Sequence, residues 1–266
     1  MTRAFLKTLI RRYRAYVDSF RDARGGLSEL HRLKIEHTER VAENACRIMS
    51  GENWPEAWTA AGEACAWLHD IGRHVQLRDY GTFRDADSLD HAACGVAVIR
   101  EERLLDGLAA ASRARILAAV ALHNRKTVPD GLADDAARLT HLVRDADKLD
   151  IFRVLEEVVD DGSLRRNPAI AWGLRLDGAP SPDVVAAVCA GQPVSYDAVR
   201  NLSDFVLIQV GWLINGLHYT ASLRLAAERR VLEYREAFLK TLSTDAGVTR
   251  CCDAARRHFA AKAVGA

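Results

Sequence analysis

The sequence predicts an all-α protein. Apolar residues recur at helical spacing through most of the chain, and no convincing run of alternating β-branched residues marks a strand. Glycine and proline signals divide this pattern into segments of helix length. The 266 residues carry a net charge of +1 with 49% hydrophobic and 27% charged residues, a composition typical of a globular chain. It argues against long disorder and against the basic excess of a dedicated nucleic-acid binder.

The first expected element is a basic amphipathic helix within residues 1–24. Five basic residues precede the first acid, Asp18, and apolar residues that include Leu9 and Tyr13 share one face. Such a helix can lie on a membrane surface, which is the alternative. We expect it to pack on the helical domain instead.

The following helices are expected between chain breaks, up to about residue 160. Their inward stripes include Val41, Ala45 and Ile48, and later Ile116 and Val120. We therefore assign residues 1–160 to one helical domain. The breaks are expected at residues 25–26, 51–55, 72, 80–90, 129–131 and 161–182.

The last third of the sequence divides into two parts. Four of the six prolines fall between Pro168 and Pro193, so residues 161–194 are expected to form an irregular connector. Residues 195–266 are expected to form a C-terminal helical extension packed on the core. Its uncharged run, residues 205–222, contains Gln209, Asn215 and His218, which favours a buried helix over a membrane span.

The cysteines and the N-terminus indicate a cytoplasmic protein. Six cysteines occur without any C-x-x-C pair, and no secretory signal peptide is recognisable. We therefore expect reduced thiols and a cytoplasmic location.

The histidines carry the strongest functional signal. His37 lies on the stripe that continues through Val41, and His69 follows Cys65 by four residues with Asp70 beside it. His123 and Asp147 likewise extend the inward stripes of their own helices. One buried histidine is usually hydrogen-bonded core, but several unsatisfied buried polar groups would each cost about 1–3 kcal/mol. A shared divalent cation would satisfy them together, and imidazole with carboxylate suits Mn, Fe, Co, Ni or Zn better than Ca or an all-oxygen Mg cage.

These residues resemble the H…HD…D signature of the HD superfamily of metal-dependent phosphohydrolases. The similarity covers roughly residues 30–160 and implies an all-helical bundle in which His37, His69, Asp70 and Asp147 bind a divalent metal, with Mg also possible. Asp145 is a rival for the last ligand. The small residue before Asp147 and the leucine soon after it match the family pattern better.

His91 and His123 resemble the additional histidines of the two-metal branches of the superfamily. In those branches the aspartate of the HD pair bridges both ions. This chain lacks the Gly-Tyr-Pro element of cyclic di-nucleotide phosphodiesterases, and Asn124 stands where a second histidine would follow His123. One or two ions per chain are therefore both expected possibilities, and otherwise His91 and His123 would contact phosphate or metal-bound water.

The resemblance implies hydrolysis of a phosphate ester of a small molecule, with a nucleotide as the first expectation. Asp70, His74 and Lys148 are the candidate catalytic residues, with His74 as a possible acid for the leaving oxygen. The loop between Arg78 and His91 is expected to cover the site. Candidate substrate-binding residues are Arg73, Arg78, Arg84, Asn124, Arg125 and Asp150, with Asp87 and Lys126 as weaker candidates.

Two other functions remain open at this point. Some relatives use the two-metal site for oxygen chemistry, so a di-iron oxygenase is one alternative, and a non-catalytic nucleotide-sensing module is another. No Walker-type loop, G-x-G-x-x-G, H-E-x-x-H or G-x-S-x-G motif supports a different enzyme class. We expect a small phosphorylated substrate, no nucleic-acid partner, no membrane span and a possible homodimer.

Overall fold

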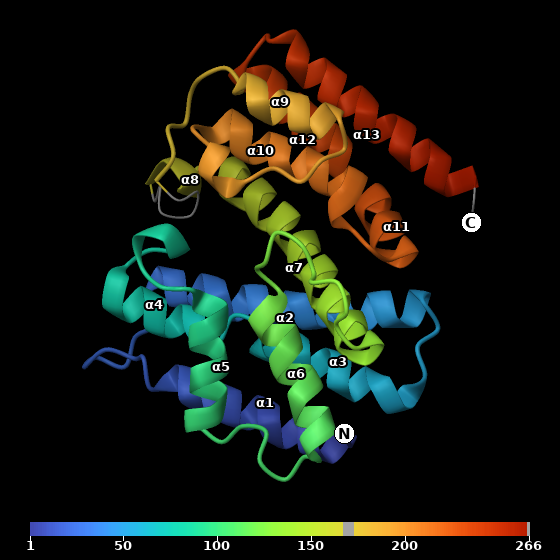
Figure 1. The fold of residues 1–266 in the computed structure, drawn as a ribbon. Helices are drawn as coiled ribbons and strands as arrows, with labels where there is room; N and C mark the ends of the chain where they lie inside the picture. The colour runs from blue at the N-terminus through green and yellow to red at the C-terminus, as the bar shows by residue number, and fades with distance from the viewer. Residues whose placement is uncertain (167–172, 265–266) are drawn as a thin grey trace. The chain divides into compact units, whose positions relative to one another are not determined.

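The computed structural model describes residues 1–166 and 173–264, and these residues form an all-α protein (Figure 1). No strand occurs among them, and the isolated backbone bridge between Arg175 and Asn201 does not extend into a sheet. The predicted fold class is therefore confirmed. The chain divides into two compact units, unit 1 (Met1–Asp150) and unit 2 (Ile151–Ala266).

Side-chain caps fix the starts of several helices in unit 1. The side chains of Thr2, Ser28 and Asp90 accept hydrogen bonds from free backbone N–H groups in the first turns of α1, α2 and α5. Gly81 ends α4 in the left-handed conformation. The elements are α1 (Arg3–Asp18), α2 (Glu29–Gly51), α3 (Glu56–Leu68), α4 (Gly72–Tyr80), η1 (Asp85–Asp87), α5 (His91–Glu101), α6 (Ala110–Leu122) and α7 (Asp134–Asp160), which continues into unit 2.

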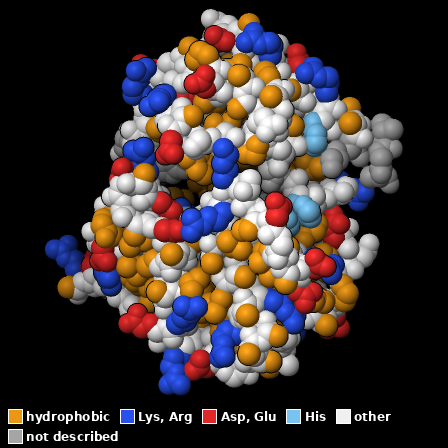
Figure 2. All heavy atoms as spheres, in the orientation of Figure 1, with side chains coloured by type: hydrophobic (Ala, Val, Ile, Leu, Met, Phe, Trp, Pro, Cys, Tyr) orange, Lys and Arg blue, Asp and Glu red, His pale blue; other side chains and the backbone are white. Residues whose placement is uncertain are grey.

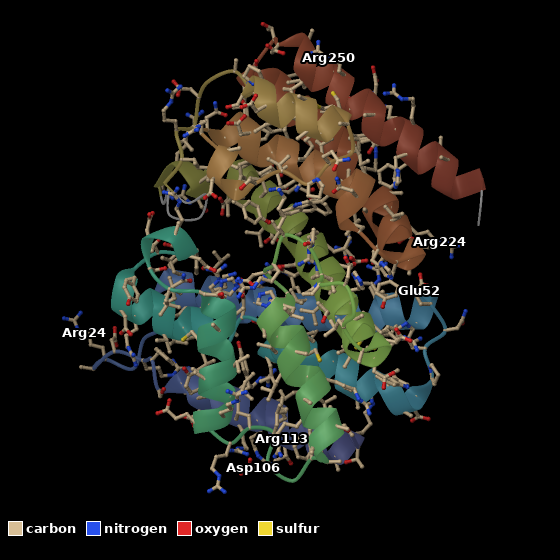
Figure 3. All side chains as sticks on the ribbon, viewed as in Figure 1. Arg24, Glu52, Asp106, Arg113, Arg224 and Arg250 are labelled. Atoms are coloured by element: carbon tan, nitrogen blue, oxygen red, sulfur yellow. The ribbon has the colours of Figure 1, made fainter. Side chains whose placement is uncertain are left out.

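Helix α1 packs on the domain through its apolar face. Leu6, Leu9 and Tyr13 are buried, and the ring of Tyr13 lies 5.5 Å from that of Trp67 on α3 in an edge-on arrangement. The exposed side chains of Arg24 and Asp106, labelled in Figure 3, lie at the periphery of the unit.

A close contact between α4 and α5 requires a glycine. A Cβ atom added to Gly72 would lie 2.2 Å from the carbonyl oxygen of His91 and 2.5 Å from the amide nitrogen of Gly95. The first turn of α4 therefore touches the backbone of α5 at the residue that begins it. This contact sets the position of His91 relative to the turn after Asp70.

Unit 2 is built around a fully buried helix. Every residue of α10 is buried, and this helix packs against α9, α12 and α13. Within the described part of the chain, no helix combines the length and apolar character that crossing a membrane requires. The unit contains the end of α7, α8 (Ser163–Arg166), α9 (Pro182–Cys189), η3 (Tyr196–Ala198), α10 (Leu202–Gly211), the π-helical turn η4 (Trp212–Gly216), α11 (Thr220–Glu228), α12 (Val231–Leu242) and α13 (Ala246–Val264).

A buried arginine joins α12 to the unit 2 part of α7. The Arg235 side chain is 0% exposed; it pairs with Glu156 and donates to the carbonyl of Phe152 and to Oε1 of Gln209. The guanidinium is thus surrounded by acceptors, as a buried charge requires.

The boundaries differ from those expected in two places. Unit 1 ends at Asp150, inside α7, rather than near residue 160. The expected irregular connector 161–194 contains two helices, α8 and α9. Pro182 does not prevent α9, because it occupies the first turn, where a missing N–H costs nothing. Residues 167–172 of that connector, with Pro168, lie outside the described part of the chain.

Candidate metal centre

Five elements of unit 1 bring the six predicted ligands together. His69 and His123 each follow the last residue of a helix, α3 and α6, whereas His91 is the first residue of α5. Helix ends leave side chains free to turn inward. The ligand candidates are His37 on α2, His69 and Asp70 after α3, His91 on α5, His123 after α6 and Asp147 on α7.

The first cluster consists of His37, His69, Asp70 and Asp147. The Nε2 atoms of His37 and His69 are 3.3 Å apart. Oδ2 of Asp70 lies 3.5 and 3.6 Å from these two nitrogens, and Oδ1 of Asp147 lies 3.1 and 3.8 Å from them. Two imidazoles and two carboxylates thus converge on one point.

The second cluster consists of His91, His123 and the same Asp70. The two Nε2 atoms are 3.0 Å apart. Oδ1 of Asp70 lies 3.4 Å from that of His91 and 3.6 Å from that of His123. Asp70 therefore directs one carboxylate oxygen to each cluster, in the manner of a bridging ligand.

The second ring nitrogen of each histidine is already committed as a donor. Nδ1 of His69 donates to the carbonyl of Ala66 at 2.8 Å, and Nδ1 of His123 donates to that of Val120 at 2.7 Å. A carbonyl only accepts, so each Nδ1 carries the proton. His37 and His91 likewise face carboxylates, at 2.7 Å from Asp150 and 2.6 Å from Asp85.

A neutral histidine with its proton on Nδ1 has a lone pair on Nε2, and in each cluster the two Nε2 atoms face each other. In the neutral form, both Nε2 atoms of a cluster are acceptors that face each other and a carboxylate at hydrogen-bond distance. The second cluster is the clearer case, because burial, with a contribution from Arg73, lowers the pKa of His91 to about 4. Such a group of buried acceptors fits a divalent cation and is poorly satisfied without one.

The carboxylates of both clusters are held in the charged form. Burial alone would raise the pKa of Asp70, but Lys34 and His69 hold it well below its usual range. Burial likewise opposes ionisation of Asp147, whose pKa His37 and His69 hold well below its usual range. The Lys34 ammonium lies 2.7 Å from Oδ2 of Asp70. The site thus presents anionic oxygen ligands at neutral pH.

The rival aspartate lies apart from this arrangement. Asp147 reaches His37 and His69, whereas Asp145 is buried on another face of α7. The two residues are about 200° apart around a helix, because each residue turns the chain by about 100°. The geometry therefore favours Asp147.

Two expected roles must be corrected. Asp150 was expected to bind substrate, but its buried carboxylate accepts from Nδ1 of His37 and from the Arg40 guanidinium. His74 was expected to act as an acid, but its buried ring stacks on His31 at 5.5 Å and lies 3.4 Å from the Tyr13 hydroxyl. Burial lowers the pKa of His74 to about 3, so it carries no proton to give at neutral pH.

Three further candidates lie beside the clusters. The Arg73 Nε atom is 3.5 Å from Oδ1 of Asp70, and its Nη1 donates to Asp85. Nδ2 of Asn124 donates to Asp90 and to Asp85, 3.0 and 3.3 Å away. Lys148 is buried next to Asp147 and donates to the carbonyl of Arg144; burial, with a contribution from Arg144, lowers its pKa to about 8.

The remaining candidates form exposed ion pairs. Arg78 pairs with its neighbour Asp79, Arg84 with Asp87, and Arg125 with Asp90. Exposed pairs of this kind contribute little to stability. The structure gives Arg78 and Arg84 no contact with the six ligands.

Three residues around the ligands were not expected from the sequence: Lys34, Arg40 and Asp85. Lys34 and Arg40 lie three residues on either side of His37, so the helix places them next to it. This spacing could have predicted from the sequence that both side chains lie close to His37. Asp85 belongs to the loop expected to cover the site, for which the sequence predicts Arg84 and Asp87 as the contact residues.

Comparison with known proteins agrees with this geometry. The HD domain family model matches residues 35–152, which include all six ligand candidates. Neither a curated protein nor a solved structure matches the chain. The chain therefore contains an HD domain, which spans residues 35–152 and carries a cluster of histidines and aspartates suited to a divalent metal.

Proposed function

We propose that this protein is a metal-dependent phosphohydrolase that acts on a phosphate ester of a small molecule, with nucleotides as the expected substrate class. The observation that carries the proposal is the convergence of four Nε2 atoms on the two oxygens of the Asp70 carboxylate, while the Nδ1 atom of each histidine is bonded to another acceptor. A divalent cation, rather than a hydrogen bond, satisfies such a group.

We further propose two metal positions that share Asp70. Each cluster offers two imidazoles and one Asp70 oxygen, and the first adds Asp147. Nitrogen and carboxylate donors in this proportion suit Mn, Fe, Co, Ni or Zn. The lack of a fourth ligand in the second cluster would leave that position open to water or substrate.

The bound ions would lower the pKa of a water molecule and neutralise negative charge on the phosphoryl group. Protein cations would support this role. Lys34 and Arg73 hold the Asp70 carboxylate, and Lys148 lies beside Asp147. These three side chains could also contact phosphate oxygens.

Attraction of an anionic substrate would have to be local. On the face drawn in Figure 2, basic and acidic side chains are interspersed, in line with the net charge of +1. A surface of this kind gives little long-range steering.

The direct test is phosphate release by the purified protein from nucleotides, sugar phosphates and cyclic dinucleotides in the presence of Mn, Co, Ni or Mg. We expect His69→Ala to abolish turnover, with His258→Ala in unit 2 as the matched control. Turnover that survives His69→Ala would contradict the proposal.

The same six residues could hold two irons, which keeps the di-iron oxygenase as a second candidate. The bridging position of Asp70 is the observation that favours it. Two tightly held irons and substrate-dependent oxygen uptake, without phosphate release, would support the oxygenase. Nucleotide binding without either reaction would support a sensor.

A further inference from the structure

We propose that Asp85 is a positioning residue that sets the metal affinity of the second cluster, so that the conformation of the loop formed by residues 81–90 governs binding of the second ion. This inference rests on the two-ion site proposed above. It concerns a residue that does not itself reach the shared carboxylate, and that acts through His91.

The first observation is the bond between Asp85 and His91. Oδ2 of Asp85 lies 2.6 Å and Oδ1 2.8 Å from Nδ1 of His91, whose Nε2 faces His123 and Asp70. A carboxylate on Nδ1 fixes the tautomer and the orientation of the ring and makes Nε2 a better ligand. Asp85 therefore prepares His91 for a cation at Nε2.

The second observation is that Asp85 is the centre of a network that holds the loop. Its Oδ1 accepts from Nη1 of Arg73 and Nε2 of Gln76, both at 2.9 Å. The same Arg73 nitrogen donates to the carbonyl of Phe83, and the same Gln76 nitrogen donates to Ser88. Because one carboxylate bonds both the loop anchors and His91, the loop and the ligand are coupled.

This network also explains the acidic group beside His91. Asp85 and Asp90 lie close enough to His91 to suggest another cation position. However, Arg73, Gln76 and Asn124 already donate to these carboxylates, and Asp90 caps α5. We therefore assign the group to holding the loop.

The third observation is the contrast with the first cluster. There Asp150 takes the equivalent position, 2.7 Å from Nδ1 of His37, and Arg40 holds it with two hydrogen bonds. The Asp150 side chain is 1% exposed and lies on a long helix, whereas that of Asp85 is 31% exposed and lies on the three-residue turn η1. A movement of the loop can therefore break the Asp85–His91 hydrogen bond of the second cluster, whereas the Asp150–His37 hydrogen bond of the first cluster does not depend on a loop.

The test measures metal binding to the metal-free full-length protein by calorimetric titration with Mn or Zn. Asp85→Ala should weaken binding of the second ion about 10- to 100-fold, the usual effect of losing an outer partner of a histidine ligand, and leave the first within about twofold. Asp85→Asn, which keeps an acceptor for Nδ1 without the charge, should fall between Asp85→Ala and the wild type.

The matched control is Asp87→Ala, two residues away in the same turn and exposed, where it pairs with Arg84. It should leave both affinities unchanged. Asp150→Asn should produce the opposite pattern, with the first ion weakened and the second retained. Thermal unfolding of each metal-free variant distinguishes a positioning effect from general destabilisation.

Two results would overturn the inference, and only the second would also overturn the two-ion site. If the wild type binds two ions and Asp85→Ala binds both as tightly, or loses both equally, the inference fails and the two-ion site stands. If the wild type binds a single ion, the two-ion proposal fails, and the inference fails with it.

Discussion

The two histidine clusters of unit 1 are built in the same way but supported differently. In each, one histidine follows the end of a helix and donates to the carbonyl three residues earlier, and the other donates to an aspartate. The histidines of each pair are 32 residues apart in sequence. The clusters differ in that the first has Asp147 and a buried helical support, whereas the second has neither. Similar ligand geometry can therefore differ in strength and in dependence on a loop.

Loss of the shared residue should have the largest effect, because it damages both clusters together. Asp70→Asn removes the charge that faces four imidazoles, and we expect both ions to be lost and turnover to fall at least about a thousand-fold, a cost of roughly 4 kcal/mol. Elemental analysis and phosphate release measure the two effects. Asp79→Asn, an exposed carboxylate on α4, is the control. Retention of one ion with near-normal turnover would show that the clusters do not depend on a common ligand.

Metal removal should destabilise the protein by a comparable amount. Without a cation the buried acceptors face one another, and a ligand present at about 1,000 times its Kd stabilises the folded state by about 4 kcal/mol. We expect a chelator to lower the melting temperature, and Mn or Zn to restore it. Asp70→Asn should show neither response. An unchanged melting temperature after complete metal removal would argue that the acceptors are satisfied in another way.

Gly72→Ala should weaken metal binding at the second cluster more than at the first, because it creates a backbone clash next to His91. In Gly72→Ala the new Cβ meets backbone atoms of His91 and Gly95, which cannot rotate away. We expect a loss of about 1–3 kcal/mol in the free energy of unfolding and weaker binding of the second ion than of the first. Gly95→Ala, whose Cβ would have its nearest neighbour at 3.4 Å, is the control. Equal weakening of both ions would mean that α4 and α5 support the two clusters alike.

The smallest effect at neutral pH concerns His74, a buried histidine outside both clusters. Its pKa is lowered by burial to about 3, so below pH 6.5 the unfolded chain binds a proton that the folded chain does not. This contribution is fully present above pH 6.5, and stability then falls by up to about 1.4 kcal/mol per pH unit as the pH drops toward 3. His74→Phe should reduce that slope by the contribution of one bound proton, about 1.4 kcal/mol per pH unit, and should leave turnover unchanged. Loss of turnover with an unchanged slope would restore His74 as a candidate acid.

Much of the fold and the ligand set could be predicted because both follow from helical periodicity. The stripes through Val41 and Val143 identified the inward faces that carry His37 and Asp147. The family resemblance, now supported by the HD domain match, added His91 to the prediction and gave His123, already expected on an inward stripe, a role at a second ion. The two histidines of each cluster are separated by the same 32 residues, and this spacing is visible in the sequence. It does not by itself predict that the histidines of a pair meet, because that depends on where the helices end.

The residues around the ligands were harder to predict, because many of them lie where a helix ends or in a loop, and helical periodicity does not predict side-chain directions there. Asp70 and His74 are four residues apart, but α3 ends at Leu68 and α4 begins at Gly72, so the same-face rule does not apply across the gap. In the turn η1, Asp85 and Asp87 face different directions, one to His91 and one to solvent. Only the path of the loop decides which of the two aspartates points inward.

The continuity of α7 has a consequence for isolating the HD domain. Unit 1 ends at Asp150 and the family match ends at residue 152, yet the helix runs to Asp160. A fragment cut at Asp150 would place Asp147 and Asp150 in its terminal turn, and a cut at residue 152 would leave both within about a turn and a half of the end, where carbonyls lose their partners and the helix frays. One ligand of the first ion and the residue that orients another would then be in the least stable part of the fragment. A truncated form should therefore retain α7 to its end.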